Sequence, residues 1–147
     1  MGRVAFWLSW PALFAYLPFT TRTRVLVVAD QEVLVTKGWL GSGKWVLPGG
    51  GLHRRELPLA GVLRELAEET GMNLDVNQVK DQGMTVARDS RLVFRCHRFA
   101  AELPSKVPVK GRRFELIDAA WVPLKELTPQ TAAWSTLDLL AKWQAGK

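Results

Sequence analysis

The stretch that decides the fold runs from Pro48 to Gly71 and reads "PGGGLHRRELPLAGVLRELAEETG". A proline and three glycines come first, two arginines follow, and a segment with helical spacing from Leu59 to Thr70 carries clustered glutamates. Like charges three or four residues apart on a helix repel by roughly a few tenths of a kcal/mol per pair. A sequence that keeps such a cluster therefore indicates that a cation is brought to it.

The glutamates have the spacing of one helix edge. Glu65 and Glu69 are four residues apart and Glu65 and Glu68 are three apart, so the three carboxylates can converge. Clustered oxygen ligands are typical of Mg²⁺ or Mn²⁺, whereas zinc prefers His and Cys. Mg²⁺ held by a few carboxylates takes further ligands from waters and substrate phosphates, and a water on the ion is a nucleophile for phosphorus. The spacing predicts a Mg²⁺ site that could also accept Mn²⁺.

Composition indicates one globular domain. The chain has 147 residues, of which 48% are hydrophobic and 23% charged, and this is enough for a hydrophobic core. A net charge of +6 favours phosphates, nucleic acid or an acidic lipid surface as partners, although an inert basic surface has the same charge. Cys96 is the sole cysteine, which excludes an intrachain disulfide and a cysteine metal site. We expect a buried Cys96 and a cytoplasmic protein.

The amino-terminal segment has a different character. Residues 4–19 are uncharged and rich in aromatic side chains, but the run is shorter than the about 20 residues of a spanning helix and contains Pro11 and Pro18. No small-residue cleavage site of a signal peptide is clear. We expect 1–20 to be a separate apolar element and 21–147 to be the folded domain. The apolar element could pack on the domain, form a homodimer contact or lie on a membrane surface.

The rest of the chain alternates strand and helix patterns. Two β-branched runs, 24–29 and 32–37, predict a hairpin, and a second hairpin is expected around Asp89 and Ser90. Pro58 suits the first position of the helix over 59–70, and Gly71 suits its end. A closing helix is expected to start with Thr128 as its cap. The pattern predicts an α/β fold with a mixed sheet and helices packed on its faces.

The glycine loop and the glutamate helix resemble a known family. Gly50, Glu56 and the run "RELAEETGM" over 64–72 fit the complete Nudix box, so the chain resembles the Nudix hydrolases from Gly50 to Met72. The resemblance implies an α/β/α sandwich with a mixed sheet between helices. It also implies a loop–helix–loop that holds a divalent metal and hydrolyses a nucleoside diphosphate linked to another moiety.

The resemblance also assigns roles to individual residues. Arg64 would orient Glu56 or a metal-binding glutamate, and Glu56 would support the site or bind a second metal. The general base would be Glu65 or a carboxylate before the last strand, where Glu115 is preferred to Asp118. The metal ligands implied by position are Glu65, Glu68, Glu69 and the carbonyl oxygen of Gly49.

Substrate contacts are more open. Arg54 and Arg55 precede the helix and either contact phosphates or are solvated. Trp39 could stack on a base, and Arg112, in a basic loop over 103–113, could receive a polyphosphate or the 5′ end of an RNA. Residues that mark hydrolases of ADP-ribose, of dinucleoside polyphosphates and of NADH are missing, so the sequence does not name the nucleotide.

Two other functional classes compete with a metal-dependent hydrolase. One is a catalytically silent module that binds a nucleotide or RNA and regulates. The intact set of Glu56, Arg64 and the three helix glutamates argues against this class. The other is a membrane-surface protein anchored by residues 4–19.

Overall fold

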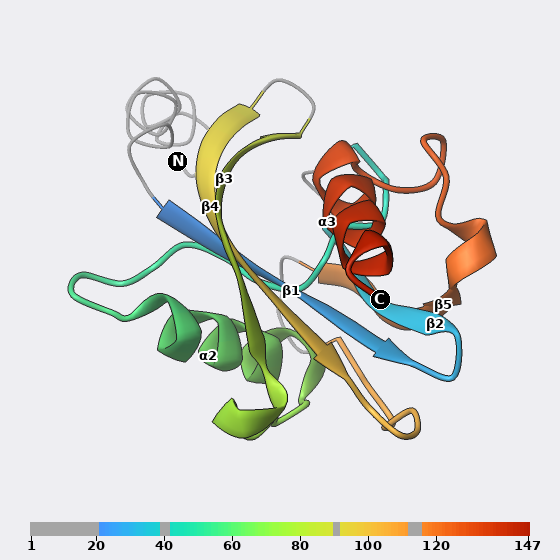
Figure 1. The fold of residues 1–147 in the computed structure, drawn as a ribbon, viewed down its shortest axis with the longest axis horizontal. Helices are drawn as coiled ribbons and strands as arrows, with labels where there is room; N and C mark the ends of the chain where they lie inside the picture. Colours follow the sequence, from blue (N-terminus) through green and yellow to red (C-terminus); the bar gives the residue numbers. More distant parts are fainter. Residues whose placement is uncertain (1–20, 39–41, 90–91, 112–115) are drawn as a thin grey trace, which may run out of the picture.

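The computed structural model describes residues 21–38, 42–89, 92–111 and 116–147. The apolar segment 1–20 and the candidate residues Trp39, Arg112 and Glu115 lie outside the described residues. The strands form one five-stranded sheet in the order β3-β4-β1-β2-β5, with helices α2 and α3 on its faces (Figure 1). The elements are β1 (Thr21–Ala29), β2 (Glu32–Gly38), α2 (Pro58–Thr70), η2 (Val76–Gln78), β3 (Lys80–Asp89), β4 (Leu92–Glu102), β5 (Leu116–Pro123), η3 (Leu124–Glu126) and α3 (Trp134–Ala145).

Both predicted hairpins are present. β1 and β2 are antiparallel with Val28 opposite Val33, and the turn residues Asp30 and Gln31 have φ of 51° and 62°. Positive φ at both positions gives a turn whose twist matches the two strands. β3 and β4 are also antiparallel, while β1 and β4 run parallel. The sheet is therefore mixed, as the sequence predicted.

Alternating side chains of the central strands supply two hydrophobic cores. Val25 and Val27 of β1 face α2, where they join Leu66. Leu26 faces the other side and joins Leu139 of α3. Residues that alternate along a strand point to opposite faces, so a run of buried residues in β1 can serve both helices. The helix–sheet–helix arrangement predicted from the sequence is confirmed.

The start of the closing helix was predicted wrongly. The helix begins at Trp134 with Ala133 as its cap, not at Pro129 after Thr128. The Thr128 N–H donates to the Thr131 hydroxyl at 2.9 Å, which closes a turn. The next residues then pair with Trp45, whose N–H donates to the Thr131 carbonyl and whose carbonyl accepts from Ala133. These contacts hold the segment extended where local pattern favours a helix.

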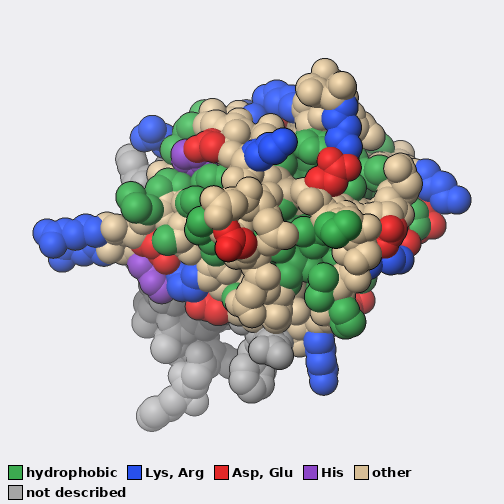
Figure 2. Space-filling model, turned by 60° about the horizontal axis from the view of Figure 1, so that its bottom comes forward, with side chains coloured by type: hydrophobic (Ala, Val, Ile, Leu, Met, Phe, Trp, Pro, Cys, Tyr) green, Lys and Arg blue, Asp and Glu red, His purple; other side chains and the backbone are tan. Residues whose placement is uncertain are grey.

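Positive charge is scattered over the face of the molecule that Figure 2 draws. On the face drawn in Figure 2, lysine and arginine side chains stand apart from one another around the periphery, with acidic groups among them. This distribution differs from the continuous basic stripe that a nucleic-acid backbone requires. Within the described part of the chain, every helix is too short or too polar to cross a membrane.

Candidate active site

The glycine loop lies against β1. The Val25 N–H donates to the Pro48 carbonyl at 3.0 Å, and the Thr23 N–H donates to the Gly50 carbonyl at 2.8 Å. Gly49 has φ of 140°, and a Cβ there would lie 2.0 Å from the Thr23 carbonyl oxygen. A Cβ on Gly50 would lie 2.6 Å from the carboxyl carbon of Glu65. Only glycine allows this loop to pass so closely between β1 and α2.

Helix α2 has the boundaries that its sequence signals predicted. Pro58 occupies its first turn, and Gly71 ends it in the left-handed conformation with φ of 76°. Gly61 faces the preceding loop, where a Cβ would lie 2.4 Å from the Leu52 side chain. These contacts fix how the helix sits on the loop, and therefore where its glutamates lie.

Two of the three helix glutamates are buried beside the loop. Glu65 is 3% exposed and Glu69 is 7% exposed, whereas the Glu68 side chain is 39% exposed. A Glu69 carboxylate oxygen accepts from the Gly49 N–H at 3.0 Å. A buried carboxylate must be hydrogen-bonded or paired, and the loop supplies such a partner. We call Glu65, Glu68 and Glu69, with Arg64 and Glu56, the acidic edge.

Arg64 holds the acidic edge together. Its Nε and Nη2 atoms donate to the two Glu56 oxygens at 2.8 and 3.0 Å. Its Nη1 atom lies 2.8 Å from a Glu65 oxygen and 3.4 Å from a Glu68 oxygen. Hydrogen bonds from Arg64, followed by one from the His53 N–H, lower the pKa of Glu56 to about 2, and Glu56 in turn raises the pKa of Arg64. Arg64 therefore contacts Glu56 and also two of the glutamates proposed as metal ligands, Glu65 and Glu68.

The predicted metal ligands contact protein groups in this structure. Among the described residues, no three His, Cys, Asp or Glu side chains are arranged around a metal position. Nη1 of Arg64 stands between Glu65 and Glu68, and the Gly49 carbonyl accepts a 2.6 Å hydrogen bond from Nη1 of Arg24. Cationic nitrogens thus lie next to predicted ligand oxygens.

The other predicted site residues that the structure describes are exposed on the surface. Arg54 and Arg55 are exposed in the turn before α2, and Arg55 has φ of 62°. Asp118 is exposed on β5, three residues after Glu115, the carboxylate that was preferred to it and that lies outside the described residues. His53 is exposed, with its backbone N–H bonded to Glu56.

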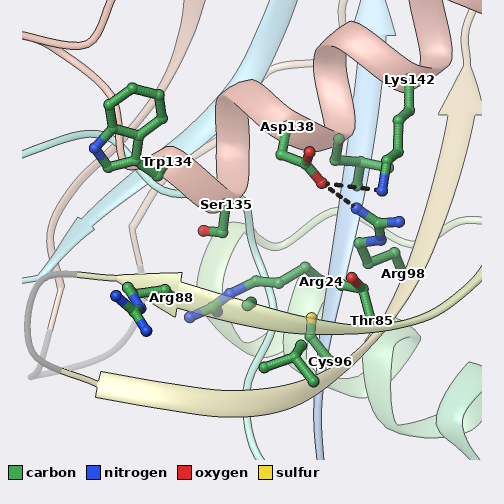
Figure 3. Close-up of a pocket in the computed structure, with 12 residues that line it drawn as sticks. Arg24, Thr85, Arg88, Cys96, Arg98, Trp134, Ser135, Asp138 and Lys142 are labelled. Atoms are coloured by element: carbon green, nitrogen blue, oxygen red, sulfur yellow. Dashed lines mark hydrogen bonds and ion pairs between the residues drawn. The ribbon is translucent and has the colours of Figure 1, made fainter.

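A pocket on the other face was missed from the sequence. It has a volume of about 310 Å³ and lies between α3 and the strands β1, β3 and β4. Figure 3 shows its strand side with Arg24, Arg88 and Arg98, and its helix side with Trp134, Ser135, Asp138 and Lys142. We call it the arginine pocket. Arginines at alternate positions in "TRTRVLVV" were a signal of a basic strand face, but the opposing helix is not visible in the sequence.

Arg24 connects the two regions. Its side chain lines the arginine pocket, and its Nη1 atom donates to the Gly49 carbonyl. The N–H of the same Gly49 donates to Glu69 of the acidic edge. One residue of the glycine loop, Gly49, therefore contacts both a pocket-lining residue and the acidic edge. Pockets of this size are typical of small-molecule sites.

The fold and the site together define a class: an α/β/α sandwich that carries a glycine loop and a helix with a fixed Arg–Glu cluster. A family model described as "NUDIX domain" matches residues 18–143. The chain belongs to the NUDIX domain family. The recognition made from the box alone is thereby confirmed.

Two curated relatives support this assignment. A "MutT-like protein" from Streptomyces ambofaciens is 43% identical over 72 residues, which cover 48% of this chain and 47% of the relative. "Nudix hydrolase 6" from Arabidopsis thaliana is 30% identical over 114 residues, which cover 72% of this chain and 39% of the relative. The chain thus spans less than half the length of these relatives.

Solved structures share the fold. The NUDIX domain of Shewanella oneidensis NrtR, in a complex with ADP ribose, has a TM-score of 0.74 at 22% identity, covering 86% of each chain. A bifunctional NMN adenylyltransferase/ADP ribose pyrophosphatase from Francisella tularensis, in a complex with AMP and a Mn ion, has a TM-score of 0.72 at 20% identity. The match covers 97% of this chain and 46% of that one.

Proposed function

We propose that this protein is a divalent-metal-dependent hydrolase that cleaves the diphosphate of a nucleoside diphosphate linked to another moiety. The observation that carries the proposal is the acidic edge, in which Arg64 fixes Glu56, Glu65 and Glu68 while the glycine loop fixes Glu69. Phosphoryl transfer depends mainly on positioning and charge neutralisation, and this arrangement supplies fixed charges. Family membership and hydrolase-named relatives support the same activity.

The donor atoms of the acidic edge are of the kind that a hard divalent cation prefers, although these described side chains do not converge on one metal position in this structure. Glu65, Glu68 and Glu69 would hold it, with the Gly49 carbonyl as a further ligand, because all four offer oxygen donors. The position of Nη1 of Arg64 between two of these carboxylates indicates that a cation is favoured there. A bound Mg²⁺ or Mn²⁺ would neutralise phosphate charge and activate water for attack on phosphorus. The Mn ion of the Francisella tularensis structure supports Mn²⁺ as an alternative.

The chain's own residues would orient this chemistry. Arg64, paired with Glu56 through two hydrogen bonds, would position Glu65 and Glu68 by their contacts with its Nη1 atom. Glu65, which is buried against Gly50, is our first candidate to accept a proton from the attacking water, and Glu115 is the second. Arg54, Arg55, Trp39 and Arg112 remain proposed substrate contacts.

The nucleotide part would occupy the arginine pocket. Relatives of the same fold bind ADP ribose and AMP, and Gly49 contacts both Arg24 of the pocket and Glu69 of the acidic edge. Trp134 at the pocket is 66% exposed, so its ring is accessible to stack on a base.

One assay series tests the proposal. A panel of nucleotide sugars, dinucleotides, nucleoside triphosphates and capped RNA is incubated with Mg²⁺ and with Mn²⁺, and release of phosphate or nucleotide is measured. We expect turnover of at least one diphosphate-linked nucleotide, and a fall in kcat of at least about 100-fold in Glu68→Gln. Glu68 is partly exposed, so the variant should fold normally.

Glu102→Gln is the matched control, because Glu102 is an exposed glutamate on β4 paired with the terminal Lys147. It should retain full turnover. Undiminished turnover in Glu68→Gln, or no turnover of any panel member by the unmodified chain, would refute the proposed function.

We also propose that residues 21–147 form the hydrolase domain and that 1–20 form an apolar element outside it. Vesicle sedimentation of the chain with and without residues 1–19 tests the membrane-surface role of residues 4–19, and sedimentation velocity tests a homodimer contact. Equal partitioning into vesicles would exclude the membrane role.

A further inference from the structure

We propose that the arginine pocket binds a second phosphate of the substrate, a phosphate monoester on the nucleoside that is separate from the diphosphate at the acidic edge. This inference rests on the proposed function and names the substrate class more closely: a nucleoside diphosphate derivative with a phosphorylated ribose.

The pocket has an excess of positive charge. Four cationic side chains line it and Asp138 is its one acidic lining residue within the described part of the chain. Asp138 is already shared: it lies 2.6 Å from Nη1 of Arg98 and 3.3 Å from Nζ of Lys142 (Figure 3). Arg24 and Arg88 thus face the cavity without a lining carboxylate of their own. Such a surplus attracts an anion of more than one negative charge. The four cationic lining residues are Arg24, Arg88, Arg98 and Lys142.

The strand arginines have buried donors to spare. The Nε atoms of Arg22, Arg24 and Arg98 are buried and have no hydrogen-bond partner among the described residues. Arg98 is itself only 7% exposed. Buried donors are normally satisfied, so the unsatisfied nitrogens of the two lining residues, Arg24 and Arg98, indicate a missing acceptor at the pocket. A phosphate monoester supplies three acceptor oxygens and matches the forked geometry of arginine.

The sheet brings these arginines together. Arg24 of β1 is directly paired with Arg98 of the parallel strand β4, and Arg22 lies two residues before Arg24, on the same face. Burial, and next the nearby Arg24, lower the pKa of Arg22, so the arginines repel each other in the absence of an anion. This repulsion lowers the stability of the free protein, and a bound anion would relieve it.

Position decides that the anion belongs to the substrate. Arg24 contacts the Gly49 carbonyl, and Gly49 contacts Glu69. A nucleotide whose diphosphate reaches the acidic edge can therefore place its nucleoside phosphate within the pocket. The base would then lie near the exposed Trp134 at the same pocket.

Matched substrate pairs that differ by one ribose phosphate test the inference. The pairs are NADP⁺ and NAD⁺, coenzyme A and dephospho-coenzyme A, and ADP-ribose with and without a 2′-phosphate. We expect kcat/KM to favour the phosphorylated member of at least one pair by about 10- to 100-fold, the gain from charge-assisted hydrogen bonds. In Arg98→Met this preference should fall towards one, mainly through a higher KM for the phosphorylated member.

Arg95→Met is the control, because Arg95 is an exposed arginine on the same strand with its side chain on the opposite face. It should keep the preference. If Arg98→Met does not fold, Arg88→Met replaces it, since Arg88 is exposed at the pocket and its loss should also reduce the preference.

A binding measurement separates this inference from the proposed function. Thermal unfolding is followed with 5′-AMP, adenosine 2′,5′-bisphosphate, adenosine 3′,5′-bisphosphate and inorganic phosphate. A bisphosphate should raise the Tm more than 5′-AMP or inorganic phosphate does, and Arg98→Met should remove the difference. Equal Tm shifts with 5′-AMP and both bisphosphates, or equal kcat/KM within every pair, would overturn the inference even if hydrolysis is observed. Absence of all hydrolysis with a selective Tm shift would instead overturn only the proposed function.

Discussion

The acidic edge and the arginine pocket are both clusters of charged side chains, but they satisfy that charge differently. At the acidic edge, Arg64 reaches three glutamates and Glu69 reaches the loop backbone. In the pocket, the Nε atoms of Arg24 and Arg98 lack a partner among the described residues, as does that of Arg22, two residues before Arg24 on β1. The comparison teaches that the carboxylates of the acidic edge already have protein partners, whereas the pocket keeps arginine nitrogens without one among the described residues. Four predictions test or refine this contrast.

The largest effect is expected where the glycine loop passes between β1 and α2. Gly49→Ala introduces a Cβ 2.0 Å from the Thr23 carbonyl and forces alanine to φ of 140°. Overpacking and backbone strain together should lower the free energy of unfolding by about 2–6 kcal/mol. Urea denaturation measures this change. Gly51→Ala is the control, because a Cβ there meets nothing within 4 Å; equal midpoints for the two variants would contradict the rigid loop.

The second prediction compares the two cores. Leu66→Ala removes a fully buried side chain under α2, and Leu139→Ala removes one under α3. Each should cost about 2–5 kcal/mol, because each leaves a cavity in a packed core. Circular dichroism and tryptophan fluorescence should report a single transition in both variants. Separate transitions in Leu139→Ala would show that the pocket face unfolds on its own. The control variants Leu66→Met and Leu139→Met keep the side-chain volume, so each should lower the free energy of unfolding by less than about 1.5 kcal/mol.

The third prediction uses the low pKa of Glu56. Glu56→Gln should lower the free energy of unfolding by about 1.5–3 kcal/mol at neutral pH, because it removes a charge-assisted pair with Arg64. Glu56 has a folded pKa of about 2 against an ordinary value of 4.5, so its contribution is complete above about pH 4.5 and is lost as the pH falls towards 2.

Denaturation curves between pH 2 and 7 measure the difference between Glu56→Gln and the unmodified chain. This difference should shrink steadily below pH 4.5. Glu126→Gln, at an exposed position, should show little difference at any pH. A difference for Glu56→Gln that is constant across the range would contradict the ionised pair.

The smallest effect should have the opposite sign. Burial lowers the pKa of Arg22, which means that the folded state disfavours its charge. Arg22→Met should therefore leave the free energy of unfolding unchanged or raise it by up to about 1 kcal/mol, after loss of the cation–π contact with Phe94. Arg64→Met is the comparison and should be destabilising, because the pKa of Arg64 is raised by its glutamates. Equal destabilisation by both would remove the distinction between the two regions.

Much of the fold could be predicted because its signals are local. Pro58 and Gly71 mark the ends of α2, and the two-residue link at Asp30 and Gln31 marks a hairpin. The start of α3 could not be predicted, because the turn at Thr128 and the pairing with Trp45 join residues far apart in the sequence. The local preference of this segment for a helix was overridden by its hydrogen bonds to Trp45.

In the candidate site, the sequence predicted the shared helix edge of the glutamates and a partner for Arg64. The spacing of Glu65, Glu68 and Glu69 gave one helix edge, and the pairing of Arg64 with Glu56 followed from position. Arg64 also lies between Glu65 and Glu68. This position depends on side-chain packing, which cannot be deduced from the spacing of residues in the sequence. The arginine pocket depends on the register of β1 with β4 and on the placing of α3, and neither is written in any one segment.

The pairing of Trp45 with the residues before α3 has a consequence for substrate size. The backbone of Trp45 is hydrogen-bonded to Thr131 and Ala133, directly before α3. The backbone of Val46, which lies three residues before Gly49, is hydrogen-bonded to Thr36 of β2. Residues 45 and 46 thus connect the start of α3 to the glycine loop, and the pairing with β2 attaches this connection to the sheet. If the base stacks on Trp134 and the diphosphate reaches the acidic edge, as proposed, this connection would fix the distance between the two ends of the substrate.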